Sequence, residues 1–281
     1  MRPFLFACLF LCVLTTQAQN IHLNLFAGAA NYSGDLQDRG YTFSQSHFAG
    51  GIGASYDMND HFAVRAALLL GKLSANDKYG RNAPRNLNFY SPLTEVNFEG
   101  VYYITPLSAH VLTPYIFAGI ALYHFNPYTF DTAGVKTFLR PLSTEGEGFL
   151  PGQKNYSLTQ FAIPFGVGVK FALSENVNVG LEVGYRKLFT DYLDDVSRSY
   201  VDEATLLANR GGTAVELAYR GDELKNGAPY PPGGSPRGSS RRDDTYYFTL
   251  LTASFRLFTG NGLGGSVGGR HSKYGCPVNV R

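Results

Sequence analysis

Hydrophobic and polar residues alternate one by one in several stretches of this chain. In the range 177–186, Val-Asn-Val-Gly-Leu-Glu-Val-Gly-Tyr-Arg, every odd position is apolar and every even position is polar or glycine. Successive side chains of a β-strand point to opposite faces, so this stretch predicts a strand with one apolar and one polar face. A soluble sandwich can contain one such strand. Here the pattern recurs at roughly 9 to 11 residues, the length of a tilted transmembrane strand, which indicates a transmembrane β-barrel.

The alternation predicts an all-β protein in which eight strands form an antiparallel up-and-down transmembrane barrel. The strands are expected at Ile21–Asn31, His47–Tyr56, Phe62–Lys72, Leu93–Ile104, Leu112–Tyr123, Ser157–Ala172, Val177–Leu188 and Tyr246–Phe258. Their apolar rows, clearest at 62–70, 161–171 and 251–257, are expected to face lipid. The strand at 112–123 carries apolar residues on both faces, so the lumen beside it is expected to be partly dry.

The predicted connections alternate in length. Short connections at 57–61, 105–111 and 173–176 are typical of periplasmic turns, and the long ones are typical of extracellular loops. An even number of strands then leaves both termini in the periplasm.

Two of the predicted extracellular loops, 124–156 and 189–245, are especially long. The second contains a proline- and arginine-rich insertion at 225–242. Its composition predicts a mobile segment that buries no core.

Both ends of the chain are expected to lie outside the barrel, which occupies residues 19–258. Residues 1–18 contain Arg2, then an apolar run, then a small-residue site, which is the pattern of a cleaved secretory signal peptide. Residues 259–281 are rich in glycine and contain basic but no acidic residues. They are expected to form a flexible periplasmic tail.

Cysteine content and net charge narrow the possible partners. The signal peptide would remove Cys8 and Cys12, so Cys276 is the one of the 3 cysteines expected in the mature protein. It is then either a free thiol or bonded to another chain. The formal net charge of +2 is too close to neutral to indicate a nucleic-acid partner. A mean hydropathy of -0.12 is compatible with a barrel, whose lumen and loops dilute its lipid-facing residues.

The interior of an eight-stranded barrel is just wide enough for side chains to fill it. Charged residues of both signs occupy inward positions of the predicted strands: Arg65, Glu95, Glu99, Lys170, Glu182, Arg186 and Arg256. Buried charges persist when they are paired, so these residues are predicted to form a plug of salt bridges. A proton or ion path through them is the alternative. Function is therefore expected in the loops, the rims, the tail or the lipid-facing surface.

Motifs for catalysis or cofactor binding are scarce. The chain has no nucleophile elbow, phosphate-binding loop, paired-cysteine metal motif or His-Glu-x-x-His segment. His124, at the end of a predicted strand, is the best enzyme candidate, because small barrels that modify lipid A keep a histidine beside a serine. Phe125 and Asn126 follow it here. An amphipathic histidine at the membrane interface is the simpler interpretation.

Two groups of acidic residues lie in the predicted loops. The first contains Asp191, Asp194, Asp195, Asp202 and Glu203, and its spacing matches no calcium-binding EF-hand loop. It is expected to be solvated. Glu145 and Glu147 alternate with glycines and are expected in a surface turn rather than in an acid–base pair. No catalytic residue, metal or cofactor is therefore predicted.

Four segments of the sequence are similar to one membrane-protein family: Ala30–Leu36, Thr113–Gly119, Pro141–Gly146 and Gly184–Ser197. They resemble the Bacteroidetes outer-membrane β-barrel family that includes PorG of the Por, or type IX, secretion machinery. The similarity runs from the first predicted strand to the last and includes the Cys276-Pro277 pair. The insertion at 225–242 departs from the compact form expected of this family.

The resemblance implies a non-enzymatic outer-membrane anchor. Such a barrel ties the outer membrane to a periplasmic ring of a lipoprotein and its partner subunit (PorK/PorN-like), on which secretion, and in some species gliding, depends. The tail would then supply the contact, through Arg270, Lys273, Cys276 and Arg281. Two alternatives stay open: a lipid-A-modifying outer-membrane enzyme and a surface adhesin that acts through its extracellular loops.

Overall fold

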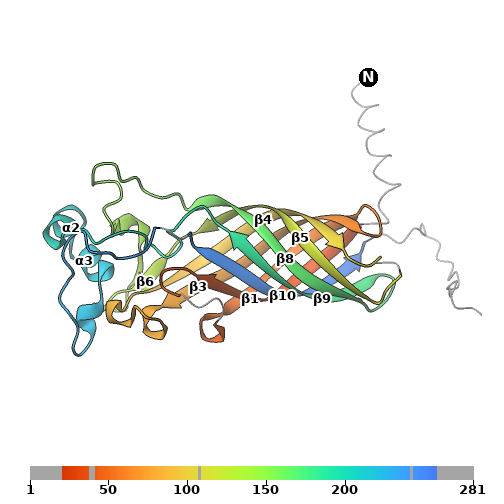
Figure 1. Cartoon of the computed structure of the whole chain (residues 1–281), viewed down its shortest axis with the longest axis horizontal. Helices are drawn as coiled ribbons and strands as arrows, with labels where there is room; N and C mark the ends of the chain where they lie inside the picture. The colour runs from red at the N-terminus through yellow and green to blue at the C-terminus, as the bar shows by residue number, and fades with distance from the viewer. Residues whose placement is uncertain (1–20, 38–41, 107–108, 241–242, 258–281) are drawn as a thin grey trace, which may run out of the picture.

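Eight long antiparallel strands close into a barrel in the computed structural model, which describes residues 21–37, 42–106, 109–240 and 243–257 (Figure 1). The barrel strands are β1 (Ile21–Ser33), β2 (His47–Asp57), β3 (Phe62–Asn76), β4 (Asn88–Tyr103), β5 (Leu112–Phe125), β8 (Thr159–Ala172), β9 (Val177–Lys187) and β10 (Thr245–Arg256). Each strand pairs with its neighbours along the barrel, and β10 pairs with β1 to close it. The predicted all-β up-and-down fold is confirmed. The predicted signal peptide and tail lie outside the described residues.

The outer face of the barrel carries an apolar band. On β5, the outward side chains of Leu112, Ile116, Ile120 and Leu122 are 44 to 63 % exposed. Ten residues at a rise of about 3.3 Å, on strands tilted by about 40°, span about 25 Å, which is the height of a lipid-facing band. The rows predicted to face lipid at 62–70, 161–171 and 251–257 also point outward.

The inner face of the barrel is filled by apolar layers with polar residues between them. Toward one end, Tyr115 and Phe117 of β5 pack with Ala63, Val101 and Tyr103. This cluster gives the lumen beside β5 an apolar lining, as the two apolar faces of the strand predict. A larger aromatic cluster fills the other end and continues past the predicted ends of β3 and β4, because Leu73, Ala75 and Phe89 are buried there as well.

The two ends of the barrel differ. Ile21 and Leu257 meet at one end, where the Leu257 N–H donates to the Ile21 carbonyl over 2.9 Å. The short turns after β2, β4 and β8 lie at this end, which we call the turn end. The long loops lie at the opposite end (Figure 1). We call their described residues the cap: 34–37, 42–46, 77–87, 126–158, 188–240 and 243–244.

The cap has secondary structure and a core of its own. It contains β6 (Tyr128–Phe130), β7 (Lys136–Phe138), α2 (Glu203–Arg210), α3 (Gly212–Ala218) and the 3-10 turns Phe43–Gln45, Asp77–Tyr79, Ala83–Arg85, Arg140–Leu142 and Gly221–Glu223. The Asp202 carboxylate caps α2 by accepting the Thr205 N–H over 3.1 Å. In the described part of the chain, no helix is long and apolar enough to cross a membrane.

The insertion at 225–242 contributes to this core. Val201, Leu206, Ala214 and Ala218 form a buried cluster, and Tyr230 of the insertion packs against it. The prediction that the insertion buries no core is therefore wrong for its described residues. Its composition cannot form a core alone, but other loops supply the apolar surface that it covers.

Candidate functional site

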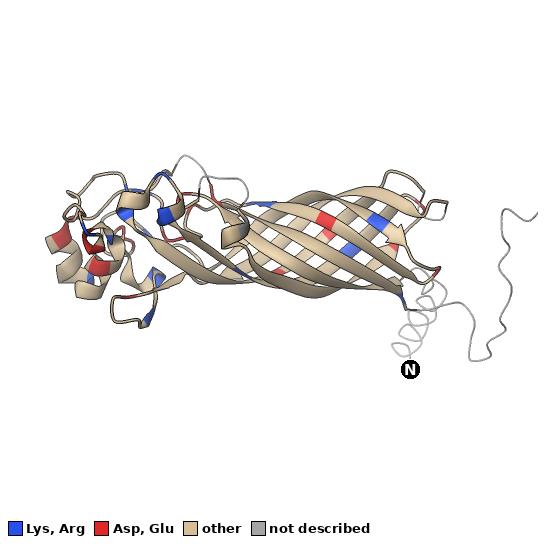
Figure 2. Ribbon diagram, turned by 90° about the horizontal axis from the view of Figure 1, so that it is seen from below, with Lys and Arg blue, Asp and Glu red and all other residues tan. Residues whose placement is uncertain are grey.

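Charged residues gather at two places, within the barrel and in the cap (Figure 2). Inside the barrel, Arg65, near the turn end of β3, forms one ion-paired layer. Its Nη2 atom lies 2.7 Å from Glu99 Oε2, and its Nη1 atom lies 2.7 Å from Glu182 Oε2. The Tyr115 hydroxyl also donates to Glu182 Oε2 over 2.8 Å. One guanidinium thus bridges two buried carboxylates, Glu99 from the neighbouring strand β4 and Glu182 from β9 across the lumen.

A second ion-paired layer lies nearer the cap. Arg186 Nη2 is 2.9 Å from Glu95 Oε1, and Arg186 Nε is 3.0 Å from Glu95 Oε2, so the pair is bidentate. The Tyr246 hydroxyl and the Asn97 amide also donate to Glu95 over 2.7 and 2.8 Å. Glu95 is 0 % exposed and Arg186 is 2 % exposed. Every strong hydrogen-bonding position of this carboxylate is therefore used inside the barrel.

The remaining predicted lumen charges lie toward the turn end. Lys170 Nζ donates to the Tyr103 hydroxyl over 2.7 Å and lies 4.7 Å from its ring centroid. Arg256 lies at the last residue of β10, is exposed, and forms no ion pair within the described residues. The structure therefore brings Arg65, Glu95, Glu99, Glu182 and Arg186 into ion pairs. Lys170 and Arg256 form no ion pair within the described residues: Lys170 bonds to Tyr103, and Arg256 lies at the rim, where β10 ends.

The space left inside the barrel is small. A cavity beside Arg65, bordered by Tyr103 and Tyr115, has a volume of about 10 Å³. This is about the space that one water molecule needs. At this level the lumen is a packed plug of side chains.

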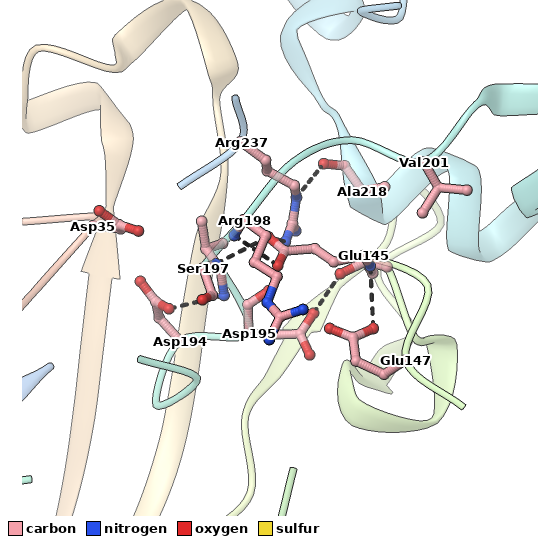
Figure 3. Close-up of polar contacts among 12 residues, drawn as sticks. Asp35, Glu145, Glu147, Asp194, Asp195, Ser197, Arg198, Val201, Ala218 and Arg237 are labelled. Carbon is pink, nitrogen blue, oxygen red and sulfur yellow. Dashed lines mark hydrogen bonds and ion pairs between the residues drawn. The ribbon is translucent and has the colours of Figure 1, made fainter. Parts of the chain in front are cut away.

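The cap is held by a buried ion pair that joins its two longest loops (Figure 3). Arg237 Nη1 lies 3.0 Å from Glu145 Oε1, and the side chains are 1 % and 0 % exposed. Arg237 also donates to the Asp195 and Ala218 carbonyls over 2.6 and 3.0 Å. The Glu145 carboxylate accepts the backbone N–H groups of Ser197 and Arg198 over 2.9 and 2.8 Å. A single pair therefore ties together residues from three parts of the sequence.

The acidic residues that were expected to be solvated are mostly buried. Asp195 Oδ2 accepts the Thr144 hydroxyl over 2.7 Å, and Asp195 Oδ1 accepts the Tyr156 hydroxyl over 2.7 Å. Glu147 is also buried, and burial, with Asp195 and Glu145 nearby, raises its pKa to about 7. The expectation of a solvated acidic cluster is therefore wrong for Asp191, Asp194 and Asp195, and it is confirmed for Asp202 and Glu203. Glu145 and Glu147 lie in a turn, as expected, but the turn is buried. A signal for burial exists in the sequence, since Leu193 and Val196 flank the Asp194-Asp195 pair.

A second arginine joins the loop between β3 and β4 to two other loops of the cap. Arg85 Nε and Nη2 lie 2.7 and 2.8 Å from the two carboxylate oxygens of Asp77. Arg85 Nη1 donates to the Arg237 carbonyl, and Nη2 donates to the Asp35 carbonyl over 3.2 Å. Three loops thus meet at one guanidinium, which explains how loops without long strands or helices hold one conformation.

Two aspartates of the cap share one tyrosine hydroxyl. Tyr32 Oη lies 2.5 Å from Asp194 Oδ2 and 2.8 Å from Asp244 Oδ1. A tyrosine hydroxyl has one proton and can donate to only one of these oxygens. The other oxygen must carry a proton that it donates to Tyr32, because two unprotonated oxygens repel at this distance. Burial accordingly raises the pKa of Asp194 to about 8 and that of Asp244 well above its usual value.

The shared proton predicts that the cap opens more readily at high pH. A carboxyl with a raised pKa keeps its proton in the folded state while the unfolded chain ionises at about 3.9, so stability falls as the pH rises between the two values. The part of the loss that comes from Asp194 is complete once the pH has passed about 8. Hydrogen-exchange protection factors of residues 189–240, compared at about pH 6 and about pH 9, measure this effect.

The matched variant for this prediction is Asp194→Asn. Its amide can donate to Tyr32 without titrating, so the decrease in protection with pH should become smaller. Equal protection of the wild-type cap at both pH values would contradict the shared proton.

Other candidates from the sequence are dispersed. His124 faces outward, and its Nδ1 atom lies 2.9 Å from the Thr159 hydroxyl. A threonine thus stands where small barrels that modify lipid A keep a serine beside the histidine. Asp202 caps α2 instead of joining the other aspartates. Within the described ranges, no group of three or more histidine, cysteine, aspartate or glutamate side chains is placed to hold a metal ion. The tail residues Arg270, Lys273, Cys276 and Arg281 lie outside the described part of the chain.

Comparisons with known proteins give one family and several solved structures. A family model described as "Domain of unknown function (DUF6089)" matches residues 1–208. Neisserial surface protein A is 13% identical, with a TM-score of 0.42 over 85% of this chain and 97% of that one. The attachment invasion locus protein Ail of Yersinia pestis is 9% identical, with a TM-score of 0.40 over 84% and 96%. OprG, an outer membrane protein of Pseudomonas aeruginosa, is 11% identical, with a TM-score of 0.40 over 84% and 97%. No curated protein matches the sequence.

Proposed function

The chain belongs to the DUF6089 family, and we propose that it is a non-enzymatic outer-membrane barrel that anchors a periplasmic ring of a type IX-like secretion machinery. The plugged lumen is the observation that carries this proposal. The ion-paired layers around Arg65 and Arg186 occupy the interior and argue against a channel. The apolar band holds the barrel in lipid. With the lumen filled and the outer face in lipid, the surfaces left for protein partners are the two ends of the barrel.

In this proposal the turn end faces the periplasm and the cap faces the outside of the cell. A polar hollow of about 530 Å³ opens at the turn end, and Asp57, Asp60, Glu175 and Arg256 line it. The last described residue, Leu257, lies at this end and follows Arg256 of the hollow. The ring lipoprotein and its partner subunit (PorK/PorN-like) would contact this surface and the basic tail, with Cys276 either free or bonded to a ring subunit.

Deletion of residues 259–281 tests the proposal. The shortened barrel should still reach the outer membrane, because the deletion removes none of its strands, whereas secretion through the machinery should fall. Heat-modifiable migration on a gel and envelope fractionation show that the barrel is folded and in place. Unchanged secretion by a correctly placed, shortened barrel would contradict the role of the tail.

A surface adhesin is the second candidate, because the cap is folded around a buried ion pair and offers a defined surface. Deleting 225–242 would remove Arg237 and disrupt the cap itself. Exposed apolar residues on the cap, Leu207 and Leu224, are better targets. For an adhesin, Leu207→Ser with Leu224→Ser should reduce attachment to surfaces and leave secretion unchanged. For an anchor, neither attachment nor secretion should change.

A further inference from the structure

We propose that a lysine-aromatic patch at the outer boundary between the barrel and the cap binds the phosphorylated headgroup of an outer-leaflet glycolipid. The patch consists of Lys72, Tyr90, Tyr128, Phe130, Lys136 and Phe138. This inference rests on the outer-membrane placement proposed above and does not depend on the secretion ring.

The position of Lys72 places the patch at the edge of the apolar band. Lys72 is the next outward residue of β3 after Leu70, which is 52 % exposed. Leu70 pairs with Thr94 of β4, and Thr94 pairs with His124 of β5, so the outward side chains become polar at this level. Lipid headgroups lie where the apolar band of a barrel ends. Lys72 therefore stands at the height of the headgroups.

The second lysine is brought there by the small hairpin of β6 and β7. Tyr128 of β6 pairs with Tyr90 of β4, and Lys136 of β7 pairs with Phe130. Lys136 Nζ lies 4.0 Å from the Tyr128 ring centroid. Lys72 Nζ lies 4.4 Å from the Tyr90 centroid and 5.8 Å from that of Tyr128. The two ammonium groups thus lie beside the same tyrosine ring.

Aromatic contacts position these cations without neutralising them. Neither Lys72 nor Lys136 forms an ion pair with a carboxylate in the described part of the chain. The acid nearest in the hairpin sequence, Asp131, uses Oδ1 to accept the Val135 N–H over 2.7 Å. Two like charges beside one ring repel, and an anion bound by both removes that repulsion. Ammonium groups of lysine are common ligands of phosphate.

The surroundings identify the anion as part of an amphiphile. The apolar row of Leu68 and Leu70 runs directly up to Lys72, and Val96 and Phe98 line the neighbouring strand; all four are exposed. A ligand that fills both surfaces has acyl chains below and phosphate above. A glycolipid phosphate bound by both ammonium groups meets both requirements, and the lipid would lie in the leaflet next to the cap.

Native mass spectrometry of the full-length barrel, released from detergent with added lipid A, tests the inference. We expect the wild-type protein to retain lipid A that carries both phosphates and to retain its dephosphorylated form poorly. Lys72→Gln with Lys136→Gln should lower retention about tenfold, since two charge-assisted contacts are lost. Lys72→Arg with Lys136→Arg keeps both charges and should keep the lipid. The matched control, Lys154→Gln with Lys225→Gln, removes two exposed lysines of the cap and should behave as wild type.

Three results would overturn the inference. They are equal retention by the wild type and the double glutamine variant, equal retention of phosphorylated and dephosphorylated lipid, and displacement of the lipid by equimolar inorganic phosphate. Heat-modifiable migration on a gel shows that each variant is folded. Envelope fractionation tests separately whether the protein lies in the outer membrane. A failure of the proposed membrane location can therefore be told apart from a failure of the proposed phosphate binding by Lys72 and Lys136.

Discussion

Arg65→Met is expected to destabilise the barrel by about 3–5 kcal/mol, the effect of removing one partner from a buried ion pair. Methionine fills much of the same volume but leaves Glu99 and Glu182 without a cation, and these residues are 0 % and 4 % exposed. The free energy of unfolding in urea, followed by heat-modifiable migration of the folded barrel, measures the loss.

Two variants make this prediction specific to the ion pairs. Arg256→Met removes the same type of residue from the exposed end of β10 and should change stability by less than about 0.5 kcal/mol. Arg65→Met combined with Glu99→Gln and Glu182→Gln removes the uncompensated charges and should recover most of the loss. If Arg65→Met were as stable as Arg256→Met, the ion-paired plug would not be a stabilising element of the barrel.

Arg237→Met should open the cap and leave the barrel folded. The substitution leaves the Glu145 carboxylate buried without its cation and also removes the donors to the Asp195 and Ala218 carbonyls. We expect a loss of about 3–5 kcal/mol in local stability. Limited proteolysis should therefore cut residues 189–240 much faster, while the heat-modifiable migration of the barrel stays unchanged.

The control for the cap is Arg210→Met, which removes an exposed arginine of α2. It should be cut at nearly the wild-type rate, because an exposed charge contributes little to stability. Equal cutting of the Arg237 and Arg210 variants would mean that the Arg237–Glu145 pair does not hold the cap together.

The barrel was predictable because strand alternation is a local property of the sequence. In β3, for example, Ala63, Arg65 and Ala67 alternate with Phe62, Val64 and Ala66, and the two sets face the lumen and the lipid. The same parity identified the charges that meet inside the barrel. The alternation of side chains does not show where a strand leaves the barrel. The alternation therefore predicts that Arg256 faces the lumen, although this residue lies at the rim.

The cap was not predictable because its contacts join distant residues. Glu145 meets Arg237, 92 residues further along the chain, and Tyr32 meets Asp244 at a separation of 212. Local composition describes such segments as polar and rich in glycine and proline. The charges of these loops are buried by partners that lie far away in the sequence. The composition of a short segment therefore underestimates how much structure a long loop can have.

Co-purification from gently solubilised envelopes, with identification of every protein that accompanies the barrel, tests the central claim of an anchor most directly. We expect a periplasmic lipoprotein and its partner subunit to accompany the barrel in constant ratio, and to be lost when residues 259–281 are deleted. A full-length barrel that purifies without either protein, from envelopes in which the secretion ring is intact, would contradict it.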